Sequence, residues 1–222
     1  TGSQTGSQTG TTTGGTGGST PTGQGGTGGS STGTPTGTGG AGAEGGTGGG
    51  GVVQCSGTHS YDAAIADCID FTNPNPDACA TYVSAGIMTI STSEYYSHNP
   101  FHAFLRFDLD PDVAQSSLSS LELSVTVAGV SYADSSNSGE IWRIVAFSRG
   151  DLWSGAPSVV GGSALAPSQG SVALNETVTW PLPPSAIDGN SVYLEMRPLT
   201  SDNTYYLNST SGSPPRLVVT CN

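Results

Sequence analysis

The chain contains no lysine, and its basic side chains besides three histidines are five arginines among 222 residues. With 17 acidic residues, the formal net charge is −12. Because nucleic-acid binding needs cationic side chains that displace counterions from phosphates, this composition argues against a nucleic-acid partner. Anionic membrane surfaces are disfavoured for the same reason. No hydrophobic run approaches the roughly 20 residues of a membrane-spanning helix, so we expect no transmembrane segment.

Residues 1–51 lack aromatic side chains and carry a single charge, Glu44. They hold 23 of the 34 glycines and 15 threonines. Such a segment buries too little apolar surface to offset the conformational entropy lost on folding. We therefore expect a disordered, low-complexity linker that acts as a flexible tether. O-glycosylation of its threonines is an alternative that would stiffen it into a stalk.

The four cysteines, Cys55, Cys68, Cys79 and Cys221, include none of the close C-x2-C pairs that are typical of zinc sites. We predict two disulfide bonds formed in an oxidising compartment, and hence a secreted or cell-surface protein. The start at Thr1 rather than methionine fits removal of an export signal. Of the three connectivities we favour Cys55–Cys68 with Cys79–Cys221, because Cys79 precedes the first predicted strand and Cys221 follows the last.

Residues 52–80 are predicted to form a cysteine-containing helical lead-in. Hydrophobic side chains at positions 61, 64, 65, 68 and 69 follow the i, i+3, i+4, i+7, i+8 spacing of one helix face. Ser60 can cap this helix, which we predict over residues 61–69. We expect its hydrophobic face to pack on the neighbouring β-domain, where the disulfides would pin it.

From Thr81 onward the hydrophobic period is two. Hydrophobic and polar residues alternate in residues 101–109, 121–127 and 192–197. These and further short segments predict about eight to ten strands separated by Gly, Pro, Ser and Asn, which is typical of an antiparallel β-sandwich over residues 81–222. The further strands are predicted at residues 82–84, 87–91, 141–147, 171–174, 177–182, 205–208 and 216–220.

Three sequence segments also carry a family resemblance: AFLRFDL at residues 103–109, YYLNS at 205–209 and PPRLVVT at 214–220. In order and spacing, residues 80–220 resemble the DNRLRE-type domain, the disaggregatase-related jelly roll of secreted microbial proteins. The resemblance implies a jelly-roll accessory module, and some relatives bind uronic-acid polysaccharides such as alginate. The stretch after Trp153 and the cysteine-containing lead-in depart from the family's pattern.

Exposed aromatic side chains are the candidates for sugar binding, because pyranose rings stack on flat aromatic faces. Tyr95 and Tyr96 are adjacent in a turn-like segment, so at least one of them should be exposed. Trp142, Trp153 and Tyr205 are the other candidate ligand-binding residues. Each tryptophan could instead pack in the core.

Asp110 and Asp112 are the candidate metal ligands, and calcium is the ion that suits them. With Asp108 they form a D-x-D-x-D pattern, but the glycine and glutamate of an EF-hand loop are missing. A solvated acidic turn is the alternative. We expect Asp108 to pair with Arg106, which lies on the same strand face. A domain this acidic repels a polyanion unless calcium bridges the two.

The sequence contains no G-x-S-x-G motif and no serine or cysteine at a recognisable spacing from a histidine. We therefore predict that the protein is not an enzyme. The predicted function is non-catalytic binding of a polysaccharide or cell-envelope glycan at or near a cell surface. The alternative is a structural surface or appendage protein whose sandwich is a self-associating building block.

Overall fold

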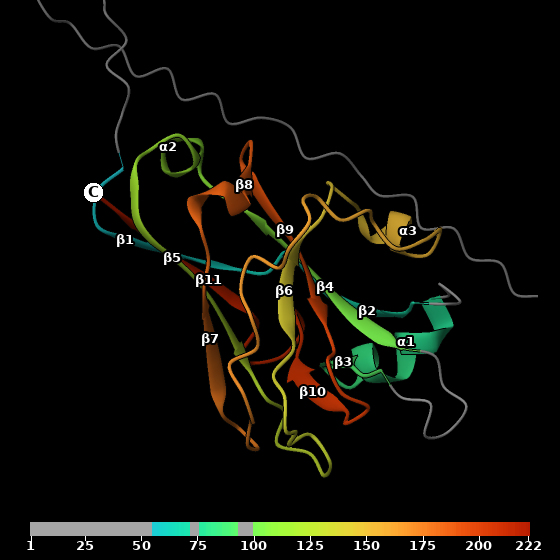
Figure 1. The fold of residues 1–222 in the computed structure, drawn as a ribbon. Helices are drawn as coiled ribbons and strands as arrows, with labels where there is room; N and C mark the ends of the chain where they lie inside the picture. Colours follow the sequence, from blue (N-terminus) through green and yellow to red (C-terminus); the bar gives the residue numbers. More distant parts are fainter. Residues whose placement is uncertain (1–54, 72–75, 93–99) are drawn as a thin grey trace, which may run out of the picture. The chain divides into compact units, whose positions relative to one another are not determined.

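Two antiparallel β-sheets pack against each other (Figure 1), and hydrophobic side chains from both contribute to a shared core. The computed structural model describes residues 55–71, 76–92 and 100–222. These residues belong to the unit formed by residues 49–222. The linker predicted for residues 1–51, and the candidate binding residues Tyr95 and Tyr96, lie outside the described residues.

The strands form two principal sheets and a short third one. Sheet A has the order β1 (Thr58–Asp62), β11 (Arg216–Cys221), β5 (Leu118–Thr126) and β7 (Thr177–Pro181). Sheet B has the order β2 (Ile65–Asp70), β4 (Phe101–Asp108), β9 (Ser191–Arg197) and β6 (Glu140–Arg143), with β8 (Ile187–Asp188) also paired to β9. The third sheet pairs β3 (Ile87–Ile90) with β10 (Thr204–Leu207).

Three of the strand pairs are nested in the sequence and alternate between the sheets. The outermost pair, β1 with β11, lies in sheet A; β4 with β9 lies in sheet B; and β5 with β7 lies again in sheet A. All three pairs are antiparallel. Nested pairs that alternate between two packed sheets are the arrangement of a jelly roll, so the predicted antiparallel β-sandwich is confirmed.

In the part of the chain that the structure describes, four short helices connect the strands: α1 (Pro76–Ser84), α2 (Pro111–Ala114), α3 (Arg149–Leu152) and the 3-10 helix η1 (Pro184–Ala186). Within the described ranges, none of the helices has the length and apolar character needed to cross a membrane. The strand predicted at residues 82–84 is wrong, because these residues form the last turn of α1.

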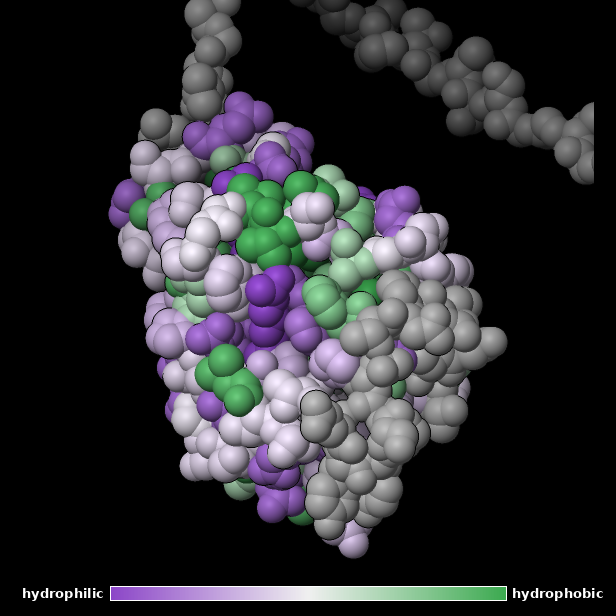
Figure 2. Space-filling view, turned by 45° about the vertical axis from the view of Figure 1, so that its right-hand side comes forward, coloured by the Kyte–Doolittle hydropathy of each residue, from purple (hydrophilic) through white to green (hydrophobic). Residues whose placement is uncertain are grey.

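A second, smaller core lies on the outer face of sheet B. It joins Ile65 and Ile69 of β2 and Phe104 of β4 to Phe147 and Leu152 in and beside α3. The α3 segment therefore covers part of the outer face of sheet B that would otherwise be exposed to solvent. Figure 2 shows the side that carries α1 and α3, where hydrophobic residues form separate groups among hydrophilic ones.

The helix predicted over residues 61–69 is wrong: this segment crosses from β1 to β2 and so contributes to both sheets. All six residues of β2 are buried, because the main core covers one face and the α3 segment covers the other. Burial on both faces removes the alternation that marks a strand, and a short hydrophobic run then resembles a helix. The sandwich thus begins at Thr58, within the predicted lead-in.

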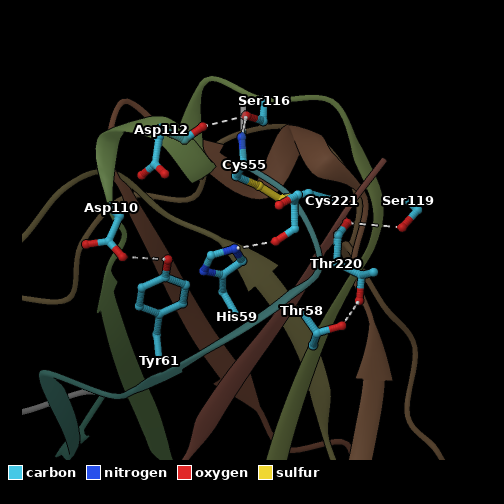
Figure 3. Close-up of a disulfide and its surroundings, with 11 residues drawn as sticks. Cys55, Thr58, His59, Tyr61, Asp110, Asp112, Ser116, Ser119, Thr220 and Cys221 are labelled. Carbon is cyan, nitrogen blue, oxygen red and sulfur yellow. Dashed lines mark hydrogen bonds between the residues drawn. A yellow bond between two sulfur atoms is a disulfide. The ribbon is translucent and has the colours of Figure 1, made fainter. Parts of the chain in front are cut away.

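The predicted disulfide pairing is also wrong. Cys55 is bonded to Cys221, with Cα atoms 5.9 Å apart, and Cys68 is bonded to Cys79, with Cα atoms 5.7 Å apart. The first strand is β1, so Cys55 is the cysteine that precedes it and faces the end of β11 (Figure 3). The second disulfide attaches α1 to β2, so a short disulfide-pinned helix exists at Pro76–Ser84.

The two disulfides should differ in their contribution to stability. They span 166 and 11 residues, for which the chain-entropy relation gives about 5 and about 3 kcal/mol. We expect the Cys55→Ser/Cys221→Ser variant to lose more free energy of unfolding in urea than Cys68→Ser/Cys79→Ser. Digestion without reductant should release a peptide pair that joins Cys55 to Cys221. A pair joining Cys79 to Cys221 would contradict the structure.

Candidate functional site

A groove of about 1010 Å³ lies among the loops that precede β6, β7 and β10. These loops are at the end of the sandwich opposite α2 (Figure 1). The groove is lined by two tyrosines, two carboxylates, one amide, one valine and several hydroxyl groups: Tyr132, Asp134, Ser135, Ser136, Ser171, Val172, Ser201, Asp202, Asn203 and Tyr205.

Hydrogen bonds between the loops fix the walls of the groove. Ser135 and Val172 exchange both backbone hydrogen bonds, at 3.1 and 2.8 Å. The backbone N–H of Ser136 donates to the carboxylate of Asp202 at 3.0 Å, which joins the loop before β6 to the loop before β10. Because its walls are tied together in this way, the groove is preformed rather than assembled by a ligand.

Tyr132 is the most exposed large hydrophobic side chain among the described residues, at 82%. Its φ is 65°, in the left-handed region that a bulky residue rarely occupies. Such a backbone conformation costs about 1–3 kcal/mol and persists where the surrounding structure imposes it, often at functional sites. Here it holds a tyrosine ring in solvent at the rim of the groove.

Tyr205, a predicted binding residue, lines the same groove. Its ring is half-buried and packs against the ring of Tyr82, with centroids 5.5 Å apart. Burial, together with the neighbouring Tyr82, raises the pKa of Tyr205 to about 12. The phenol therefore stays protonated at physiological pH and can donate a hydrogen bond. Tyr205 belongs to β10, which pairs with β3, so the strand pairing and the contact with Tyr82 fix the position of this ring.

Trp142 does not line the groove; it lies on the outer side of β6. The guanidinium of Arg197 covers its ring at 4.5 Å, and its indole N–H donates to Glu140 at 3.1 Å. Arg197 also donates to Glu195, a buried carboxylate that His102 contacts at 2.6 Å. The protein itself thus occupies one face of this tryptophan.

Trp153 ends α3 and is 45% exposed. It lines a separate hollow of about 360 Å³ together with Arg149, Asp67 and the Cys68–Cys79 disulfide. Arg149 donates to Asp67 at 2.6 Å, and this ion pair fastens α3 to β2. Burial raises the pKa of the Asp67 carboxyl, against the opposing effect of Arg149.

Asp110 and Asp112 lie at the start of α2 (Figure 3), and α2 is at the end of the sandwich opposite the groove (Figure 1). Asp110 accepts a hydrogen bond from the hydroxyl of Tyr61 at 3.1 Å, while the hydroxyl of Ser116 donates to the backbone carbonyl of Asp112. Calcium binding by the two carboxylates stays a prediction. The expected pair of Arg106 with Asp108 is present at 2.8 Å.

Within the described ranges, three histidine, cysteine or acidic side chains come close enough to share a metal ion at one place: Cys55, His59 and Cys221. The disulfide between Cys55 and Cys221 occupies both sulfur atoms (Figure 3). Thiolates, not disulfides, are the usual cysteine ligands. This cluster is therefore structural.

The fold and this end of it define an antiparallel β-sandwich with a groove rich in tyrosine and hydroxyl groups. A scan against models of protein families finds no match, and no curated protein matches the chain significantly. The resemblance to the DNRLRE-type domain stays a prediction.

Sequence reasoning found Tyr205 but missed Tyr132 and the two aspartates near it. Tyr132 lies in the connection between β5 and β6, where neither hydrophobic periodicity nor a sequence motif indicates a site. The available signal was a single aromatic residue within a segment of Ser, Ala, Asp, Asn and Gly. Aromatic residues in such polar loops have no core to fill and are candidates for ligand contact.

Asp67 makes stability depend on pH in a testable direction. Because its folded-state pKa is raised, its contribution is greatest below its unfolded pKa, near 3.8, and is lost as the pH rises through the higher folded value. We expect the free energy of unfolding of Asp67→Asn to improve relative to the wild type as the pH rises from about 3 to neutrality. Urea unfolding across this range measures the difference. A relative loss with rising pH would contradict the assigned shift.

Proposed function

We propose that the protein is a non-catalytic extracellular binding module whose groove takes a polysaccharide. The observation that carries this proposal is the pairing of Tyr132 and Tyr205 with hydroxyl, amide and carboxylate groups in one preformed groove. Residues 1–51 would tether the module at or near a cell surface.

The chemistry of the groove suits a sugar better than an apolar ligand. Tyrosine offers an apolar face on which the C–H groups of a pyranose can stack, and its hydroxyl can bond to a sugar hydroxyl. Aspartate and asparagine oxygens accept hydrogen bonds from sugar hydroxyls, and serine hydroxyls can donate or accept. Few apolar side chains line the groove, which argues against a lipid or another hydrophobic molecule.

Secretion is supported by the cysteines. Both disulfides are formed among the described residues, and disulfides persist in oxidising compartments outside the cytoplasm. A polysaccharide ligand at the cell surface is consistent with such a location.

A structural building block would instead present one contiguous apolar patch to its own copies. On the side of α1 and α3, Figure 2 shows hydrophobic groups that are separated by hydrophilic residues. This observation favours the binding module. Self-association remains the second outcome that the binding experiment can return.

The groove can be tested with a panel of soluble and insoluble polysaccharides and the full chain. We expect saturable binding that Tyr132→Ala weakens about tenfold, or ~1.4 kcal/mol, because one stacked ring is lost. The exposed ring contributes little to the core, so the melting temperature should hardly change. Trp153→Ala is the matched control, since it removes an exposed aromatic outside the groove and should leave binding intact.

Two results would overturn the assignment of the groove. Binding lost in Trp153→Ala but kept in Tyr132→Ala would move the site to the α3 hollow. Binding abolished by a chelator and by Asp110→Asn/Asp112→Asn would move it to α2. Absence of binding to every polysaccharide, together with concentration-dependent self-association, would favour the building block.

A further inference from the structure

Every arginine of the chain is already paired with a carboxylate of the same chain. Arg149 pairs with Asp67, Arg106 with Asp108, Arg197 with Glu195, Arg216 with Asp62 and Arg143 with Asp188, at 2.6, 2.8, 2.9, 3.0 and 3.8 Å. The sequence has no lysine. The protein therefore has no unpaired lysine or arginine with which to meet an anionic ligand.

The charged side chains that line the groove are all acidic. Asp134 and Asp202 line it, both are exposed, and no basic side chain is among its lining residues. Asp202 accepts the backbone N–H of Ser136, and in the described part of the chain neither aspartate forms an ion pair. A ligand in the groove thus meets two carboxylates and no compensating cation.

We infer that the groove accepts glycans without anionic groups and excludes uronic-acid and sulfated polysaccharides. This inference rests on the binding function proposed above. Each of the two aspartate charges near this exposed site opposes a ligand carboxylate by roughly 1 kcal/mol, which is about fivefold in affinity per charge. A protonated amine in place of the carboxylate reverses the sign, so an amino-sugar polymer should bind more tightly than its N-acetylated form.

Without a bridging cation, an anionic glycan could pair with an arginine only by competing with the carboxylate that already holds it. The ion pair of Arg143 with Asp188 should be the easiest to open, because its N···O distance of 3.8 Å is the longest of the five. Arg143 lines a different hollow, with Val160, Leu165 and Pro183, and not the tyrosine groove. Binding through Arg143 would therefore differ in location from binding in the groove.

The test compares three oligosaccharides of equal length by calorimetry on the full chain: a glucosamine hexamer, its N-acetylated form and a galacturonate hexamer. Low salt and a chelator keep the charge effect visible and prevent bridging by calcium. We expect the affinity to fall in the order amine, N-acetyl, uronate, with at least a tenfold step between the last two. Added salt should reduce both differences in affinity, between amine and N-acetyl and between N-acetyl and uronate.

The Asp134→Asn/Asp202→Asn variant isolates the charge of the groove. It should bring the uronate affinity to within about threefold of the N-acetylated hexamer and remove the advantage of the amine. The matched control, Glu122→Gln/Glu140→Gln, makes the same change of charge away from the groove lining and should preserve the order.

The possible outcomes distinguish a failure of the charge exclusion from a failure of the proposed binding function. Uronate binding equal to or tighter than that of the N-acetylated hexamer would overturn the charge exclusion and leave a binding module, with Arg143→Gln showing whether the opened ion pair is responsible. If no hexamer and no polysaccharide of the panel binds, the proposed function itself fails.

Discussion

The pairing of the first strand with the last is the constraint on which the rest of the structure depends. β1 lies against β11 over five residue pairs, and the Cys55–Cys221 disulfide joins the ends of the two strands. Closing the chain in this way leaves the remaining strands to nest inside, with β4 against β9 and β5 against β7. The loops between nested strands then meet at one end of the sandwich, where the groove is found.

Alternation of hydrophobic and polar residues predicted most of the sandwich. β4, β5, β7, β9 and β11 have the expected positions, because each has one face toward the main core and mostly polar side chains on the other. β2 could not be recognised, since the α3 segment covers the face that would have been polar. That cover comes from residues about 80 positions later in the chain, and local periodicity carries no information about it.

The error in β2 also produced the error in the disulfides. A cysteine just before the first strand does pair with the cysteine at the end of the last strand. Because the sequence pattern predicts a helix where β1 and β2 form, it places Cys79 before the first strand, whereas in the structure Cys55 precedes β1 and is bonded to Cys221. The groove was harder to foresee, because Tyr132 and Tyr205 are 73 residues apart and only the fold brings their loops together.

The proposed ligand site consists of the loops around Tyr132 and Tyr205. It is tested most directly by a backbone amide NMR titration of the full chain with an uncharged oligosaccharide that binds. We expect saturable chemical-shift changes at residues 132–136, 171–172 and 201–205, with α2 and α3 unchanged. Chemical-shift changes centred on Trp153 and Arg149, with no changes in these loops, would contradict the assignment of the ligand site to the groove.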